Sequence, residues 1–286
     1  MSRRNNEDRI GAKKSSGAEL PPQAMTQEDG GSSLNFVVPT EFVELPSKGR
    51  YYPENHPLYM QENIEIRFMT AKDEDILTSR TLLKQGVALQ RFVNNIIVDK
   101  RVKVNSLLVG DKNAIIVAAR VSGYGAQYAT RIACPACLSN VEYEFDLDTA
   151  SVTEGEINEQ EGVYITEAST LMVALPATKV NLEVKHLTGH DEVEMAKSAK
   201  NKNKSAGPTI TGQLKKMIVS VNEDRSPMTI RRFIETMPAK DSRHLRKLYK
   251  KASPNIDLTQ HFECPECGHE QPLEVPFTAD FFWPDR

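Results

Sequence analysis

The sequence predicts an α+β fold: a small mixed body of helices and strands with a split four-cysteine zinc ribbon and an inserted helical segment. Three observations predict it. Apolar residues recur every three or four positions between residues 70 and 120, the spacing of a buried helix face. Apolar and polar residues alternate around two Cys-Pro-x-Cys motifs, as they do in paired strands. Between these motifs lies a basic stretch with helical spacing.

Residues 1–33 carry almost no bulky apolar side chains and predict a disordered polar arm, because such a segment cannot bury enough surface to offset its ordering entropy. The chain contains no run of about 18–20 apolar residues, and its first residues are polar with no apolar signal core. We therefore expect a soluble protein that is neither inserted in a membrane nor secreted.

The first ordered segments combine a strand with helices. Alternating apolar residues predict a half-buried strand at Ile64, Ile66 and Phe68. Thr70 followed by Asp73 approximates a capping box, although Asp replaces the usual Glu or Gln, and predicts a helix to about Leu83. A second helix face is predicted from the spacing of Leu89, Phe92, Val93, Ile96 and Ile97. Asp111 is the predicted N-cap of a third helix. Residues 114–119 are apolar on almost every side of this helix, so we expect it to be deeply buried.

Strand patterns flank the first cysteine motif and recur around the second. Residues 128–132 and 141–147 predict one hairpin, and residues 261–277 predict another. Between residues 142 and 148 the acidic side chains alternate with apolar ones. Such carboxylates could bind a metal or act as a catalytic pair, but a solvated strand face is the interpretation we favour.

The segment between the hairpins predicts further strands at residues 164–173 and 179–185, and helices at 191–200, 210–222, 228–237 and 241–252. A loop composition covers residues 201–208. The chain therefore divides into a polar arm (1–33), an α+β body with the first knuckle (34–150), an inserted strand and basic helical segment (151–257), and a second knuckle with an aromatic C-terminus (258–286). Phe281, Phe282 and Trp283 predict either a plug against the ribbon, which we favour, or a docking peptide.

All four cysteines of the chain belong to the two motifs: Cys134, Cys137, Cys264 and Cys267. Four thiolates in two C-x-x-C knuckles match the closed tetrahedral coordination of a structural zinc. A redox pair at a helix N-terminus, disulfides, or another thiolate-bound metal such as iron are the alternatives. His261 and His269 lie near the second pair, but four cysteines suffice without them.

The two knuckles are unusually far apart. There are 126 residues between Cys137 and Cys264, whereas an ordinary zinc ribbon has about 15–20. Closing the longer loop costs roughly 2 kcal/mol more, against about 10 kcal/mol from a structural zinc. Gly268 follows the second pair, where a left-handed residue is often needed, while Leu138 holds that place in the first.

Charge is segregated along the chain. Residues 132–178 hold nine acidic residues and no Lys or Arg, whereas residues 195–251 are rich in Lys and Arg. An acidic and a basic surface of this kind could each bind a different partner, or the two could bind each other. A basic segment next to a zinc ribbon makes nucleic-acid binding an alternative function. Against it, aromatic residues are sparse in this segment and no nucleic-acid recognition motif is present. No P-loop or nucleophile elbow occurs, so we expect no enzymatic activity.

Several motifs, taken in order, carry a family resemblance: residues 45–53 (LPSKGRYYP), 69–77 (MTAKDEDIL), 254–257 (PNID), 262–268 (FECPECG) and 281–284 (FFWP), with Phe233 and Leu245 between them. Over residues 40–286 the chain resembles the baseplate hub and tail-assembly proteins of T-even-like contractile-tailed bacteriophages. The resemblance implies a non-enzymatic late protein that contacts other tail or baseplate proteins, as a structural component or an assembly factor. It implies the host cytoplasm during assembly, or the virion tail baseplate, as its location.

Overall fold

The computed structural model describes residues 37–157, 159, 162–202, 209–275 and 279–282. The chain forms two units, residues 1–37 and 38–286, and the fold below is that of the second unit. The predicted polar arm (1–33) lies outside the described residues, as do residues 203–208 of the predicted loop and residues 283–284 of the aromatic C-terminus.

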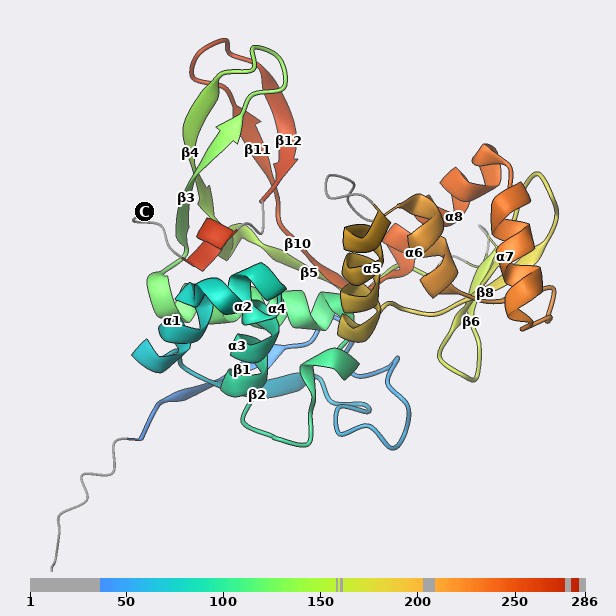
Figure 1. Cartoon of the computed structure of the whole chain (residues 1–286), viewed down its shortest axis with the longest axis horizontal. Helices are drawn as coiled ribbons and strands as arrows, with labels where there is room; N and C mark the ends of the chain where they lie inside the picture. The colour runs from blue at the N-terminus through green and yellow to red at the C-terminus, as the bar shows by residue number, and fades with distance from the viewer. Residues whose placement is uncertain (1–36, 158, 160–161, 203–208, 276–278, 283–286) are drawn as a thin grey trace, which may run out of the picture. The chain divides into compact units, whose positions relative to one another are not determined.

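The second unit combines helices with antiparallel strands, which confirms the predicted α+β class (Figure 1). The helices are α1 (Ala71–Thr78), α2 (Arg80–Gln85), α3 (Ala88–Ile96), α4 (Val109–Tyr124), α5 (Gly189–Lys202), α6 (Ile210–Met217), α7 (Pro227–Thr236) and α8 (Ala239–Ala252). Short 3-10 turns are η2 (Val104–Ser106), η3 (Leu147–Thr149) and η5 (Ala279–Phe282). Within the described residues no helix combines the length and apolar character needed to cross a membrane.

The strands form small antiparallel sheets. They are β1 (Thr40–Glu44), β2 (Asn63–Arg67), β3 (Gln127–Ala133), β4 (Asn140–Asp146), β5 (Ser151–Thr153), β6 (Val163–Ile165), β7 (Leu171–Ala174), β8 (Asn181–Val184), β9 (Ile218–Val221), β10 (Asn255–Asp257), β11 (Thr259–Glu263) and β12 (Glu270–Glu274). Two-stranded sheets pair β1 with β2, β3 with β4, β5 with β10 and β11 with β12. The remaining sheet has the order β6-β7-β8-β9.

A first hydrophobic core joins α3, α4 and the β1–β2 hairpin. The helix face predicted from apolar spacing is confirmed at Phe92, Val93, Ile96 and Ile97, which are completely buried, but is wrong at Leu89, which is exposed. The apolar run of α4 is buried as predicted. Phe281 and Phe282 are buried in this same core, so the predicted plug is present for these two side chains. It lies against the helices and the base of β3, however, and not at the cysteine end of the ribbon.

Arg120 of α4 holds the C-terminal turn against this core. Its guanidinium is completely buried and donates to the carbonyl oxygens of Phe281 at 2.7 Å, Gly125 at 2.7 Å and Gln127 at 3.0 Å. The same group lies over the rings of Tyr124 and Tyr128. Burial lowers the pKa of the Arg120 guanidinium. One side chain therefore connects the end of α4, the start of β3 and η5.

A second core packs the β6–β9 sheet against α6, α7 and α8. The predicted apolar faces of α7 and α8 are confirmed, since Ile234, Leu245 and Leu248 are buried. The strand predicted for residues 164–173 is two strands, β6 and β7, which pair as a hairpin. The chain returns from α8 to the first core through Pro254, which passes close to the backbone of Gly110 in α4. If residue 110 had a Cβ atom, that atom would lie only 2.1 Å from the Pro254 carbonyl oxygen. Glycine at 110 permits this close backbone approach.

The helix predicted for residues 210–222 is wrong in its second half. α6 ends at Met217, and the following residues form β9, which pairs with β8. Ile218, Val219 and Val221 are β-branched and suit a strand, and pairing with β8 buries Ile218 and Val221. Helical spacing alone did not reveal this partner because β8 lies more than 30 residues earlier in the chain.

Two predicted helix boundaries also need correction. The helix predicted to run from residue 71 to about 83 breaks at Ser79, whose extended backbone ends α1 and whose hydroxyl caps α2. The predicted N-cap at Asp111 is wrong, since α4 is capped at Leu108 and Asp111 lies in its first turn. The buried Asp111 carboxylate instead accepts hydrogen bonds from the Ser47 N–H (3.0 Å), the Ser47 hydroxyl (2.6 Å) and the Tyr52 hydroxyl (2.7 Å). It therefore anchors the segment 45–53 to α4.

The predicted capping pair at the start of α1 is confirmed and extends into a buried ion pair. The Thr70 N–H donates to the Asp73 carboxylate at 2.9 Å, as a capping box requires. Arg67 donates two hydrogen bonds to Asp73, at 2.6 and 2.9 Å, and Asn95 adds one at 2.6 Å. Burial raises the pKa of the Asp73 carboxyl, but these hydrogen bonds outweigh it and lower that pKa to about 2.

Because the Asp73 carboxyl has a lowered pKa in the folded chain, we expect the free energy of unfolding to fall at acidic pH. The unfolded pKa of Asp is about 3.9, so the stabilisation is complete only above about pH 5 and is lost progressively as pH falls toward 2. The loss is on the order of 2 kcal/mol. Urea unfolding between pH 2 and 5 should show this loss in the wild type and a flatter profile in Asp73→Asn. Equal slopes in the two proteins would contradict it, and the exposed Asp75→Asn serves as the control.

Candidate metal centre

The four cysteines lie at the ends of two hairpins, β3–β4 and β11–β12, which stand side by side (Figure 1). Each hairpin turns through a knuckle with the same hydrogen bonds. The Cys134 N–H donates to the Ser139 carbonyl, and the Cys264 N–H donates to the His269 carbonyl, both at 2.9 Å. The N–H of the residue after each second cysteine donates back to the carbonyl of the first cysteine, also at 2.9 Å. The two knuckles are thus structural repeats.

The sulfur atoms converge on one point. The four Sγ atoms all lie within 4.8 Å of one another. Cys134 and Cys267 have Sγ atoms 3.8 Å apart, and Cys137 and Cys264 have the same separation. Four sulfurs about 2.3 Å from a tetrahedral zinc are about 3.8 Å apart, which these two separations match. The four cysteines follow strands and do not lie at helix N-termini, so the structure lacks the setting that the redox alternative requires.

Two of the cysteine thiols, Cys137 and Cys267, have pKa values shifted in opposite directions. Hydrogen bonds from the Ser139 side chain and backbone lower the pKa of the Cys137 thiol to about 6. The His269 backbone lowers the pKa of Cys267, but desolvation and the neighbouring cysteine sulfurs outweigh it and raise that pKa to about 12. The first thiolate to form therefore opposes ionisation of its neighbour. A divalent cation at the centre would remove this conflict and would allow all four thiolates to form.

Apolar packing supports the sulfurs from beneath. Val141 and Phe262 form a small cluster with the buried Cys134 and Cys264. Tyr143 stacks edge-on against Phe262 at 5.0 Å and donates its hydroxyl hydrogen to the His261 carbonyl at 2.7 Å. Nearer the base, the Gln260 side chain accepts from the Asp146 N–H at 3.1 Å and donates to the Asp146 carbonyl at 2.7 Å. These contacts join the two hairpins without the metal.

The other residues singled out near the motifs lie outside the sulfur cluster. The His261 side chain is 66% exposed, and His269 is half-buried. Among the described residues, the group that converges for metal binding contains the cysteines and neither histidine. Glu142, Glu144 and Asp148 are exposed, which agrees with the predicted solvated strand face.

Leu138 and Gly268 occupy equivalent left-handed positions, with φ of 61° and 66°. A left-handed conformation costs a non-glycine residue about 1–2 kcal/mol. The Leu138 side chain is 77% exposed, so packing offsets little of this cost. Leu138→Gly is expected to stabilise the chain by roughly 0.5–1 kcal/mol after the entropy of the extra glycine is included. Thermal unfolding checks this; the reciprocal Gly268→Leu should destabilise, and destabilisation by Leu138→Gly would contradict the argument.

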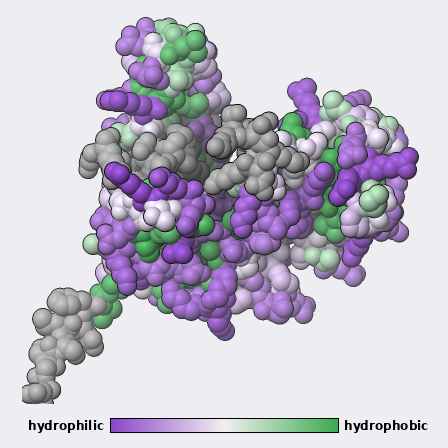
Figure 2. Space-filling model, in the orientation of Figure 1, coloured by the Kyte–Doolittle hydropathy of each residue, from purple (hydrophilic) through white to green (hydrophobic). Residues whose placement is uncertain are grey.

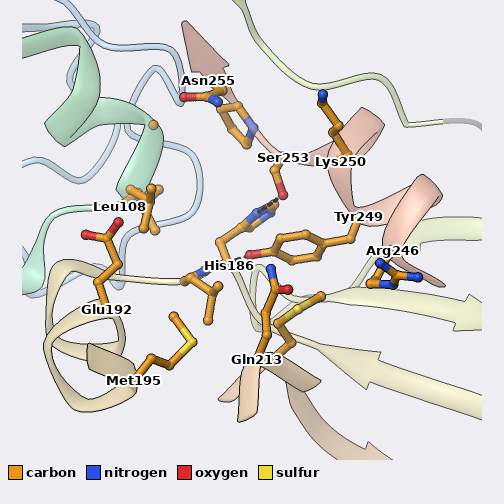
Figure 3. A pocket seen from close by; sticks show the side chains of 15 residues that line it. Leu108, His186, Glu192, Met195, Gln213, Arg246, Tyr249, Lys250, Ser253 and Asn255 are labelled. Carbon is orange, nitrogen blue, oxygen red and sulfur yellow. Dashed lines mark hydrogen bonds between the residues drawn. The ribbon is translucent and has the colours of Figure 1, made fainter. Parts of the chain in front are cut away.

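Sequence reasoning missed a second concave site, formed between α4, α5 and α8 (Figure 3). This cavity has a volume of about 430 Å³. His186 is buried beside it; its Nδ1 lies 3.4 Å from the Ser253 Oγ, and its Nε2 has no hydrogen-bond partner among the described residues. Burial lowers the pKa of His186 to about 4, so its ring is neutral near pH 7. No sequence motif marks this histidine, because its neighbours come from distant segments.

Comparison with known proteins identifies the family. A family model described as T4 bacteriophage base plate protein matches residues 38–283. Searches of curated proteins and of solved structures gave no significant match. The matched region contains both hydrophobic cores and both cysteine knuckles, and it confirms the resemblance drawn from the sequence motifs. The chain therefore belongs to the T4 bacteriophage base plate protein family.

Proposed function

We propose that the chain is a non-enzymatic component or assembly factor of the phage tail baseplate hub, acting through protein–protein contacts on a scaffold held by one structural zinc. The observation that carries this proposal is the family match across residues 38–283, which includes all four cysteines. Tail proteins are the expected partners, in the host cytoplasm during assembly or in the virion tail.

The architecture supports a scaffolding role. The metal would be held by Cys134, Cys137, Cys264 and Cys267. When bound, zinc supplies four strong bonds in closed coordination, with no open position for water or substrate. Since each hairpin contributes two ligands, the metal fixes the hairpins to each other and so presents a rigid projecting surface. Rigid surfaces lower the entropy cost of assembly contacts.

Co-expression with the tail proteins encoded beside this gene tests the proposal. The wild-type chain should co-purify with at least one of them, and Cys264→Ser should lose this binding while the exposed His261→Ala retains it. Mass spectrometry of purified phage particles then separates the two roles, because a component stays in the virion and an assembly factor does not. Neighbouring genes for transcription or replication proteins, together with no binding to tail proteins, would overturn the proposal.

Nucleic-acid binding is the second candidate, favoured by the exposed cations of α8, which include Arg243, Arg246 and Lys247. Titration of labelled duplex DNA over a salt series tests it. Nucleic-acid binding predicts an affinity that falls steeply with salt. Absence of binding at low salt would eliminate this candidate.

A further inference from the structure

The cavity beside His186 has the size and the lining of a ligand site. Its volume of about 430 Å³ lies within the range of about 300–1,000 Å³ that is usual for such sites. Its apolar wall consists of the buried Leu108, Leu187 and Met217 with the half-buried Met195 of α5. On the face drawn in Figure 2, helices α5 to α8 present mostly hydrophilic residues, so this wall differs from the surface around it.

The charge on the cavity lining is positive once its ion pairs are counted. The charged side chains that line it are Glu192, Arg246 and Lys250. The Glu192 carboxylate forms an ion pair with Lys112 of α4. Lys250 is attracted to the carboxylate of Asp257, which lies outside this cavity. Arg246 is therefore the charged side chain of the lining that has no counterion among the described residues.

Arg246 of α8 lines the cavity on the side away from Glu192 (Figure 3). Its Nε donates to the Ser242 carbonyl of the same helix at 3.4 Å, and no other hydrogen bond or ion pair joins it to a described residue. It also borders the separate cavity along α8, but it pairs with none of the carboxylates there. A guanidinium whose terminal nitrogens are free can bind a carboxylate through two parallel N–H groups.

The lining also contains a side-chain amide without a partner. In the view of Figure 3, Gln213 lies between Met195 and Arg246. The Gln213 amide forms no hydrogen bond with any described residue, although it can both donate and accept. A peptide group satisfies such an amide in both directions, because it offers one N–H and one carbonyl oxygen. A free alkyl carboxylate has no peptide group and would leave the amide unpaired.

We infer that the cavity binds the C-terminal residue of a partner polypeptide, with an apolar side chain against Met195, the peptide group on Gln213 and the terminal carboxylate on Arg246. The three parts of such a residue match the three parts of the lining. Capture of a C-terminal carboxylate is an established way to recognise a polypeptide. The inference rests on the proposed role in protein–protein contacts, for which it states the chemistry of one partner.

Fluorescence anisotropy of the full chain with short labelled peptides tests the inference. The probe is a peptide that ends in leucine with a free carboxylate, and its matched control is the same peptide with a C-terminal amide. The acid should bind, and the amide should bind at least tenfold more weakly because it lacks the charge that pairs with Arg246. A peptide acid that ends in serine should also bind at least tenfold more weakly, because it leaves the apolar wall uncovered.

Two arginine variants locate the carboxylate. Arg246→Gln should weaken binding of the leucine acid at least tenfold and leave binding of the amide unchanged, a difference that a general loss of structure would not produce. Arg243→Gln is the matched control and should have little effect, because Arg243 is also exposed on α8 but does not line this cavity. Circular dichroism of each variant confirms that it is folded.

Competition with octanoate separates a polypeptide from a free alkyl carboxylate. Octanoate should displace the leucine acid only at a concentration at least tenfold higher than the unlabelled peptide requires, because it leaves Gln213 unpaired. Gln213→Leu should weaken binding of the peptide but not of octanoate. Octanoate that competes as strongly as the peptide would assign the cavity to a free alkyl carboxylate and would overturn the inference.

Three further results would overturn it: no binding of the leucine acid, equal binding of the acid and the amide, or equal weakening by Arg243→Gln and Arg246→Gln. The last would indicate a general attraction to the basic helix. Each of these results leaves the proposed function in place if the chain still co-purifies with a tail protein, since that contact can use another surface.

Discussion

Replacing Cys264 with serine is expected to open both hairpins of the ribbon and to lower the free energy of unfolding by several kcal/mol. A structural zinc contributes about 10 kcal/mol or more, and loss of one ligand forfeits much of this. Without the metal, the cysteine ends of the hairpins keep only a small apolar cluster, whereas Tyr128 and Phe145 at the base of β3 and β4 stay packed in the first core. Two-stranded hairpins are marginal in water on their own. Hydrogen exchange should show lost protection in β3, β4, β11 and β12, while α4 retains most of its protection.

Chelation of the wild type should give the same exchange pattern, and adding zinc back should reverse it. The exposed His261→Ala is the matched control on the same hairpin and should keep wild-type protection. Unchanged protection in metal-free protein would mean that packing alone holds the ribbon.

Arg120→Ala is expected to be the most damaging substitution away from the cysteines, by on the order of 4 kcal/mol. Hydrogen bonds to a charged group are worth about 1.5–3 kcal/mol each, and truncation removes this donor from three carbonyl oxygens and opens a cavity. The C-terminal turn η5 should detach first, because the Phe281 carbonyl accepts from the guanidinium at 2.7 Å.

Chemical denaturation measures the total loss in the free energy of unfolding. Hydrogen exchange at the amides of residues 279–282 shows whether the loss is centred on η5. Arg120→Lys should lose less stability than Arg120→Ala, because the lysine ammonium keeps the charge. It should still lose some, because lysine lacks the planar fork that reaches three carbonyl oxygens. Arg131→Ala is the matched control, because its exposed pair with Glu142 is worth well under 1 kcal/mol. A loss below about 1 kcal/mol for Arg120→Ala would show that η5 is held by the phenylalanine rings alone.

Local patterns were enough to predict the knuckles and most helices. Each Cys-Pro-x-Cys motif closes its own turn, and the alternation on either side of it identifies paired strands. The association of two knuckles 126 residues apart followed from chemistry, because a closed tetrahedral site needs four ligands and the chain has four cysteines. The domain boundaries drawn from composition remain a prediction.

Features that depend on distant partners could not be predicted. Asp111 reads as a helix cap in the sequence, yet its carboxylate binds Ser47, 64 residues earlier. The end of α6 becomes a strand because β8 is available to pair with it. The buried His186 and the cavity beside it arise where residues from distant segments meet, and no local spacing marks such a junction. In each case tertiary contacts override the local pattern.

Native mass spectrometry of the purified full chain tests most directly whether the four cysteines hold one zinc between them. Wild-type protein purified without chelator is expected to carry one zinc per chain, and Cys134→Ser and Cys264→Ser are each expected to lose it, since each removes a ligand from a different hairpin. Retention of one zinc by His261→Ala and His269→Ala would complete the expected pattern. A wild-type chain that is folded and free of metal, or one that keeps its zinc after either cysteine substitution, would contradict a single site shared by both knuckles.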